Sequence, residues 1–278
     1  MSFNFGEKTW PEIQEYIEKD ALIILPVGEI EEHSLYLPVD TDVRIASFLA
    51  AEIADEVESK IPVLVLPTIW SGYTPSRVCH WPGCIQLQIP VFTEMVHDIC
   101  ASIVHMGFNK LIMLDCHGQH HPMLNTVTKM IADEYDKYFI VASPFTLSAD
   151  DFNKIRKSPR GGVSHAGEWE TSMIMHITPE LVHTDKFTDA DSIKYHSNFV
   201  AGDSVAGGQK VIWSSWGLEN TTYGALGDPT SACTETAGHI IQSIRKNFKE
   251  LILEYYNFKS PAYQKEKNPK YEVRHVSE

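Results

Sequence analysis

Short apolar runs alternating with amphipathic stretches constrain the fold of this chain most. Four runs have the length and composition of buried β-strands, at residues 21–27, 63–67, 110–115 and 138–143. Between them, apolar residues recur at helical spacing over 42–59, 91–106 and 121–135. Because alternating strands and helices form parallel sheets covered on both faces, the pattern predicts an α/β fold with a mostly parallel sheet.

The remaining segments add helices and one long connection. Helical patterns also occupy residues 10–19, 168–177 and 230–256. Asp42 stands where the helix that follows it needs a capping residue. The segment from 70 to 88 is rich in Gly, Pro and aromatic residues and is longer than a simple connection requires. The region from 187 to 227 is irregular, with one candidate strand at 210–214.

The length of the chain suits one large α/β domain. It has 278 residues, of which 43% are hydrophobic, an ordinary value for a globular protein. Internal repeats, low-complexity segments and linkers are not evident, so residues 1–278 are expected to form a single domain. The tail from 260 to 278 is charged and contains proline, and we expect it to lie on the surface or on a neighbouring subunit.

Charge and cysteine content exclude several classes of partner and location. The net charge of −14 argues against nucleic acid or an anionic membrane as partner, because both require a basic surface. Five cysteines without a CxxC pair indicate reduced thiols. The first residues lack an export signal, and no apolar run reaches the roughly 18 residues of a membrane span. These features predict a cytoplasmic protein.

The first chemically suggestive stretch, residues 28–42, directly follows the first strand. It contains Glu31, His33 and Asp42, whose oxygen and imidazole atoms suit Zn, Mn or Fe. Pro38 prevents these residues from sharing one helix face. They would lie on a loop at the carboxyl end of a strand, where open α/β sheets bind their ligands. The alternative is an acidic surface loop with one histidine.

The second stretch, residues 115–121, follows the third strand and contains three histidines. His117 precedes a glycine, so it is a plausible metal ligand on a turn at the same edge of the sheet as His33. A polar loop in which one histidine caps the next helix is the alternative.

The third stretch, residues 165–172, opens the helix predicted at 168–177. Glu168 and Glu170 lie in its first turn, where the helix dipole stabilises carboxylates without any functional role. Their side chains point about 200° apart on a helix, so at most one of them faces a site easily. His165 precedes this turn and could relay protons. Capping and catalysis both remain open for this stretch.

Taken together, the three stretches resemble the motifs of the creatininase (creatinine amidohydrolase) family. The family pattern G-S-x-E-Q-H-G-x-H-L-P-L-x-T-D keeps its register over residues 28–42, and N-G-H-G-G-N corresponds to 115–120. The pattern H-A-G-x-x-E-T-S matches residues 165–172 throughout. Further landmarks occur at 80–83 and 224–229, so the resemblance runs from about residue 20 to residue 240.

The resemblance implies a three-layer α/β/α domain with two divalent ions per chain, Zn before Mn or Fe. Carried over by position, one ion would be held by Glu31, Asp42 and His117, and the other by His33 and the bridging Asp42. The family's remaining glutamate position is Gln119 here, so this role is assigned to Glu170. His165 matches the family's proton-relay histidine and, with Glu170, is the expected catalytic residue.

The resemblance also implies hydrolysis of a small polar substrate by metal-activated water. Departures from the family pattern at Tyr36, Gln119 and His120 suggest that these residues line the substrate pocket, and His80 of the landmark at 80–83 is expected there too. Cleavage of the C–N bond of a cyclic amide or formamide is the leading expectation. C–C ring opening of an inosose-type diketone is the alternative, and a non-catalytic metal-dependent binding protein is the second alternative.

Family members are commonly oligomers, often hexamers, so a homo-oligomer is expected. Its interface would use the loop at 70–88 or the aromatic segment with Tyr255, Tyr256, Phe258 and Tyr263.

A serine hydrolase is unsupported because the Gly-x-Ser-x-Gly motif is missing from the sequence. A nucleotide-binding Gly-x-Gly-x-x-Gly pattern is missing as well.

Overall fold

A computed structural model describes residues 3–76, 79–192, 198–200, 202–207, 210–211 and 221–258. Its central sheet has four parallel strands in the order β2-β1-β3-β4. The strands are β1 (Leu22–Val27), β2 (Val63–Val65), β3 (Lys110–Asp115) and β4 (Ile140–Ala142). All four predicted strands are therefore confirmed, and their parallel pairing follows from the helices that connect them.

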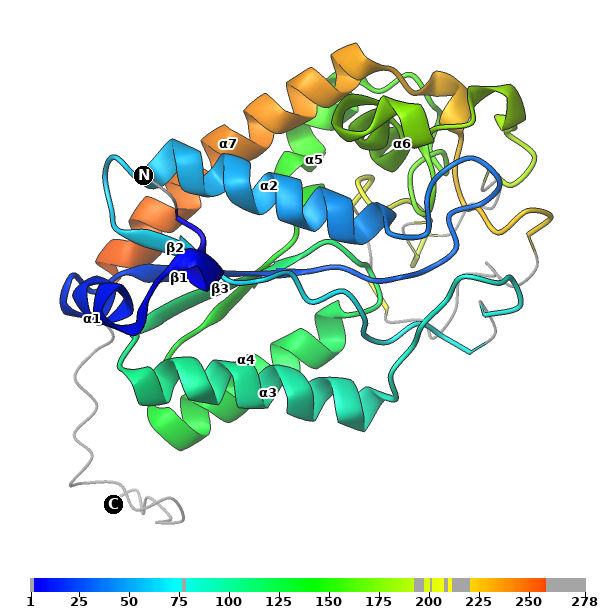
Figure 1. Cartoon of the computed structure of the whole chain (residues 1–278). Helices are drawn as coiled ribbons and strands as arrows, with labels where there is room; N and C mark the ends of the chain where they lie inside the picture. The colour runs from blue at the N-terminus through cyan, green and yellow to red at the C-terminus, as the bar shows by residue number, and fades with distance from the viewer. Residues whose placement is uncertain are drawn as a thin grey trace, which may run out of the picture.

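Helices cover the sheet on both faces, as Figure 1 shows. On one face lie α2 (Thr41–Val57), α5 (Pro144–Ile155), α6 (Glu168–Ile177) and α7 (Thr234–Asn257). On the other face lie α3 (Ile89–Met106) and α4 (His121–Tyr135), together with Ile13 of α1 (Trp10–Glu18). This is the predicted three-layer α/β/α arrangement.

Alternation along the strands explains why there are two cores. In β1, Leu22 and Ile24 face the core beneath α2 and α7, whereas Ile23 and Leu25 face the core above α3 and α4. Every residue of β1 is buried, which is typical of a central strand covered on both faces.

The register of the sheet brings two of the chemical stretches together. Val27 and Asp115, the last residues of β1 and β3, are paired across the two strands. The amide of Cys116 donates to the carbonyl oxygen of Val27 at 3.0 Å, so the segments that follow both strands start side by side. The residues after position 28 and after position 115 therefore leave the sheet at one edge.

Two helix predictions need correction. Asp42 does not cap α2: Asp40 occupies the position before the helix, and Asp42 lies inside its first turn with a buried side chain. The helix α5 is not among the predicted helices, although Pro144 at its start and buried Phe145 and Phe152 are compatible with helical spacing. The polar residues of α5 interrupt the apolar pattern, so the sequence alone did not indicate this helix.

Parts of two predictions lie outside the described residues. Residues 210–211 form no strand, and the rest of the candidate strand at 210–214 is not described. The tail at 260–278, including Tyr263, is not described either. None of the described helices combines the length and the apolar character that crossing a membrane requires.

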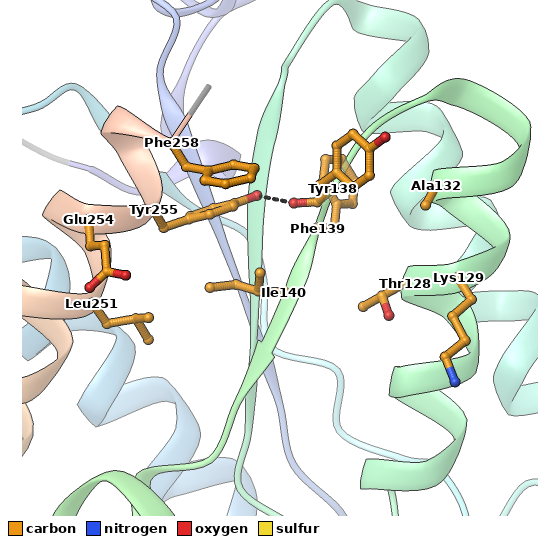
Figure 2. A pocket seen from close by; sticks show the side chains of 10 residues that line it. All are labelled: Thr128, Lys129, Ala132, Tyr138, Phe139, Ile140, Leu251, Glu254, Tyr255 and Phe258. Atoms are coloured by element: carbon orange, nitrogen blue, oxygen red, sulfur yellow. Dashed lines mark hydrogen bonds between the residues drawn. The ribbon is translucent and has the colours of Figure 1, made fainter. Parts of the chain in front are cut away.

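An apolar groove of about 430 Å³ lies beside β4, at the edge of the sheet. Figure 2 shows it between α4 and the end of α7, with Tyr138, Phe139 and Ile140 on one side and Tyr255 and Phe258 on the other. Its lining shares no residue with the three chemical stretches.

Tyr255 joins α7 to the sheet at this groove. Its hydroxyl donates to the carbonyl oxygen of Tyr138 at 2.8 Å and accepts from the amide of Leu111 at 3.3 Å. We expect Tyr255→Phe to lower the free energy of unfolding by about 1 kcal/mol, because buried backbone groups lose a partner. Urea denaturation followed by circular dichroism measures this change.

Tyr256→Phe is the matched control, because it removes a neighbouring hydroxyl but keeps the ring that lies 5.2 Å from the Lys110 ammonium nitrogen. Equal losses of stability in both variants would contradict the proposed contribution of the Tyr255 hydrogen bonds.

Candidate metal centre

Four segments deliver buried polar side chains to the carboxyl edge of the sheet. The loop after β1 carries Glu31 and His33, and the first turn of α2 carries Asp42. The turn after β3 carries His117, and the first turn of α6 carries Glu170. All five side chains are at least nine-tenths buried, so the residues expected to bind metal come together although four separate segments supply them.

Asp42 lies between two histidines. One of its carboxylate oxygens is 3.2 Å from Nε2 of His33, and the other is 2.9 Å from Nδ1 of His117. Burial would raise the pKa of Asp42, but the two histidines outweigh burial and hold that pKa below its ordinary value. Each oxygen of this carboxylate thus faces a different potential ligand.

Glu31 lies on the other side of His117. Its Oε2 atom is 3.3 Å from Nε2 of His117 and accepts a hydrogen bond of 3.0 Å from the hydroxyl of Thr74. Its Oε1 atom is 3.5 Å from Nδ1 of His165. Glu31 therefore connects the two histidine-containing halves of the site.

His33, His165 and Glu170 form a compact group on the second side. One potential ligand atom from each lies within 4.8 Å of the other two. Nδ1 of His33 is 3.0 Å from the carbonyl oxygen of Glu31, which leaves Nε2 turned toward Asp42. Nε2 of His165 likewise lies 2.7 Å from the carbonyl oxygen of Glu32. Histidines that bind metals are commonly oriented in this way, through their other ring nitrogen.

The two acidic residues of α6 have different surroundings. The Glu168 carboxylate accepts hydrogen bonds from the amides of Lys157 and Ser158, at 2.8 and 2.7 Å. Glu170 accepts from the amide of Ala166 at 2.6 Å and belongs to the group with His33 and His165. Only Glu170 faces the site, consistent with the angular separation of the two positions on a helix.

The charges of these residues fit divalent cations. Burial would lower the pKa of His117, but Glu31 and Asp42 raise it to about 10. The pKa of His165 is likewise raised well above its ordinary value, mainly by Glu31 against the effect of burial. The carboxylates thus favour the protonated form of both imidazoles, and a cation bound to His117 would replace the proton there.

Two ring nitrogens support the same interpretation. Within the described residues, Nε2 of His33 and Nε2 of His117 are buried and make no hydrogen bond. Each faces a carboxylate oxygen, that of Asp42 at 3.2 Å and that of Glu31 at 3.3 Å, without forming a hydrogen bond to it, and a cation bound by both groups would explain this. The residues present therefore fit a metal centre of nitrogen and oxygen ligands.

His120 lies behind His117 rather than at the rim of a pocket. It is fully buried, with its ring centroid 4.5 Å from that of His117. Its Nε2 atom is 3.1 Å from Oε2 of Glu29. Burial raises the pKa of Glu29 to about 8 and lowers that of His120 well below its ordinary value, so this pair is neutral near pH 7.

The other expected pocket residues have different positions. Tyr36 is fully buried in the core, and its hydroxyl donates to the carbonyl oxygen of Ala166 at 2.7 Å. It therefore supports the turn before α6, where Ala166 has a φ of 53°. His80 is exposed on the loop at 70–88 beside Trp81, and Gln119 is half-buried on the turn after His117.

Two residues that touch the site lack a sequence signal for this role. Thr74 lies in the loop at 70–88, and its contact with Glu31 spans 43 residues of sequence. In the sequence, Glu29 is one more acidic residue of the first stretch. Its contact with His120 is evident only from the fold.

Comparison with known proteins gives one family. The family model described as creatinine amidohydrolase (Creatininase) matches residues 6–252. The 3-dehydro-scyllo-inosose hydrolase of Thermotoga maritima is 28% identical over 192 residues, which cover 67% of this chain and 60% of that protein. The creatinine amidohydrolase of Pseudomonas putida is 25% identical over 199 residues, covering 66% of this chain and 75% of that protein.

A solved structure described as "Creatininase Mn" has the same fold. It superposes with a TM-score of 0.74 at 20% identity, covering 92% of this chain and all of that one.

Proposed function

Because the chain belongs to the creatininase family of metal-dependent hydrolases, we propose that it binds two divalent ions and hydrolyses a small polar carbonyl compound. The observation that carries this proposal is the position of Asp42 between His33 and His117. One carboxylate oxygen directed at each imidazole is the arrangement that a bridging ligand needs. An acidic surface loop would instead expose these groups to water.

The described contacts suggest how the ligands divide between the ions. Glu31, Asp42 and His117 would hold one ion, and His33, Asp42 and Glu170 the other. Nitrogen and oxygen donors suit Zn best, with Mn or Fe as alternatives. The "Creatininase Mn" relative supports divalent ions at such a centre.

When bound, two such ions would activate a water molecule and polarise the substrate carbonyl. Asp42 and His33 are both buried, so the surrounding side chains keep bulk water away from them. His165 would carry a proton to the leaving group, because the carbonyl oxygen of Glu32 fixes one of its ring nitrogens and the other faces the site. Glu170 would hold its metal and also orient the turn that carries His165.

Cleavage of an amide C–N bond, in a cyclic amide or a formamide, is the leading reaction. The creatinine amidohydrolase relative acts on such a bond, and the family model carries the same description. A non-catalytic metal-dependent binding protein is the weaker proposal, because the family that the chain matches is described by a hydrolase activity.

C–C hydrolysis of an inosose-type cyclic diketone is a second candidate. The specific observation that favours it is the 28% identity to the 3-dehydro-scyllo-inosose hydrolase, although the alignment covers only 60% of that relative. The same activated water could attack a ketone in place of an amide.

A substrate screen with controlled metal content tests the proposal. Protein loaded with Zn²⁺ or Mn²⁺ would be assayed against lactams, formamides and cyclic diketones, and its ions counted by elemental analysis. We expect about two ions per chain, hydrolysis of one substrate class, loss of that activity on chelation and recovery on adding the ion back. Hydrolysis that persists after verified removal of the ions would contradict the proposal.

We further propose that the chain forms a single domain and assembles into a homo-oligomer, with a hexamer as one candidate size. The loop at 70–88 and the end of α7 near Phe258, which is 56% exposed, are the candidate contact surfaces. Light scattering at micromolar concentration measures the assembly, and a monomer would contradict it.

A further inference from the structure

The loop at 70–88 is fastened to the candidate metal centre. The amide of Ile85 donates to the carbonyl oxygen of Ile30 at 2.9 Å, and the hydroxyl of Ser71 donates to the carbonyl oxygen of Ile85 at 2.7 Å. The first of these bonds joins the loop to the segment that carries Glu31. A loop held in this way can position a side chain inside the site.

Thr74 is the side chain so placed. It is fully buried, and its hydroxyl donates to Oε2 of Glu31 at 3.0 Å. The same oxygen lies 3.3 Å from Nε2 of His117. We propose that Thr74 is a positioning residue that fixes the Glu31 carboxylate for its ion, and that the buried Glu29–His120 pair holds the loop in the position this requires. This inference rests on the proposed function, because it gives Glu31 the role of a metal ligand.

The Glu29–His120 pair connects the loop to the sheet edge. Nε2 of His120 accepts a hydrogen bond of 3.0 Å from the amide of Tyr73, the residue next to Thr74. The same nitrogen is 3.1 Å from Oε2 of Glu29, two residues before Glu31. The imidazole therefore links the backbone beside Thr74 to the segment of Glu31.

Packing around His120 leaves the loop little freedom. A Cβ atom on Gly72 would lie 2.2 Å from Nε2 of His120, so the backbone can pass this ring only because residue 72 has no side chain. On α3, Phe92 stacks against the ring, with centroids 4.4 Å apart. His120 is thus confined between the loop and a helix, and Tyr73 and Thr74 are confined with it.

The physical role follows from how carboxylates bind ions. A hydrogen bond to one ligand atom restricts rotation of the carboxylate and favours the orientation that binds the cation. Loss of such a partner typically costs about 10–100-fold in metal affinity or activity. Thr74 has no charge to contribute, so its effect should be of this size rather than a complete loss of the ion.

Thr74→Val removes the hydroxyl and keeps the shape of the side chain. Metal-free protein would be titrated with Zn²⁺ and with Mn²⁺ in competition with a chromophoric chelator, and the melting temperature of the metal-free form would be recorded. We expect Thr74→Val to weaken one of the two ions about 10–100-fold. Thr74→Ser keeps the hydroxyl and should bind both ions nearly as the unmodified protein does.

Thr236→Val on α7 is the matched control, because it also replaces a buried threonine but lies outside the site. It should leave both affinities unchanged. Unchanged affinity for both ions in Thr74→Val would overturn the inference while leaving the proposed function intact. An unmodified chain that binds no ion would overturn the proposed function and, with it, this role of Thr74.

A double-mutant cycle tests the role of the Glu29–His120 pair separately. His120→Ala should weaken the same ion as Thr74→Val, and the two substitutions together should weaken it little more than either alone, because they act through the same carboxylate. Additive effects, or an effect on the other ion, would show that the pair does not act through Thr74.

Discussion

Asp42→Ala is expected to remove both divalent ions and to abolish hydrolysis. The two carboxylate oxygens of Asp42 face different histidines, at 3.2 Å from His33 and 2.9 Å from His117. These distances are shorter than the 3.3 and 3.5 Å contacts that Glu31 makes with His117 and His165. Without it each ion would lose a ligand and the shared charge that keeps the two cations close together. The fall in turnover should exceed the roughly 100-fold effect typical of residues that only support a ligand.

Elemental analysis and turnover measured on the same preparation test this expectation. Asp40→Ala is the control, because Asp40 lies two residues away and pairs with Arg44 at 2.7 Å outside the site. It should keep both ions and full turnover. Two ions per chain in Asp42→Ala would show that Asp42 does not bridge them, and the ligand assignment would have to be abandoned.

The sequence was sufficient for the fold because its strands are short and mainly apolar. A buried parallel strand such as β1 needs no polar alternation, so it reads as a continuous apolar run. The helices follow because their apolar spacing is regular, apart from α5, where Asp150, Asp151 and Asn153 interrupt the pattern. Local sequence therefore determined most elements, and the parallel pairing followed from their order.

The residues of the candidate site could be predicted only where several of them lie close together in one sequence motif. Glu31, His33 and Asp42 lie within one stretch, and the carboxyl-edge rule places His117 beside them. The resemblance to the family motif favoured Glu170 over Glu168, although both are acidic residues of one first turn. The angular argument alone says that one of them faces the site but not which of the two does.

Residues that meet the site across long stretches of sequence could not be predicted. The contact of Thr74 with Glu31 spans 43 residues, and that of Tyr36 with Ala166 spans 130. A buried hydroxyl leaves no pattern in a single sequence, since threonine and tyrosine are also common in loops and cores. The place of Tyr36 in the family motif suggested the pocket rim, and nothing in the sequence indicated that packing directs its ring into the core.

His165 presents the sharpest question at the site, because its surroundings permit three roles. Its Nε2 atom lies 2.7 Å from the carbonyl oxygen of Glu32, which supports orientation for proton transfer. Its proximity to His33 and Glu170 would also permit metal binding. Its position before α6 would permit a purely structural role.

We expect proton transfer, because Glu31, His33, Asp42, His117 and Glu170 already supply ligands for two ions. His165→Ala should then keep both ions and the fold while kcat falls by about 10²–10⁴-fold, the usual contribution of a general acid or base. The variant's kcat, ion content and melting temperature would be measured together with the substrate that the screen identifies.

The outcomes of this experiment separate the three roles of His165. Loss of one ion per chain would make His165 a ligand, and near-normal kcat with a lowered melting temperature would make it structural. His97→Ala is the control, because His97 is a mostly buried histidine on α3 that pairs with Glu134 at 3.0 Å away from the site. It should change stability alone. If kcat falls in His165→Ala but not in His97→Ala, the loss is due to the catalytic role of the His165 imidazole. It is then not a general effect of replacing a histidine that pairs with a carboxylate.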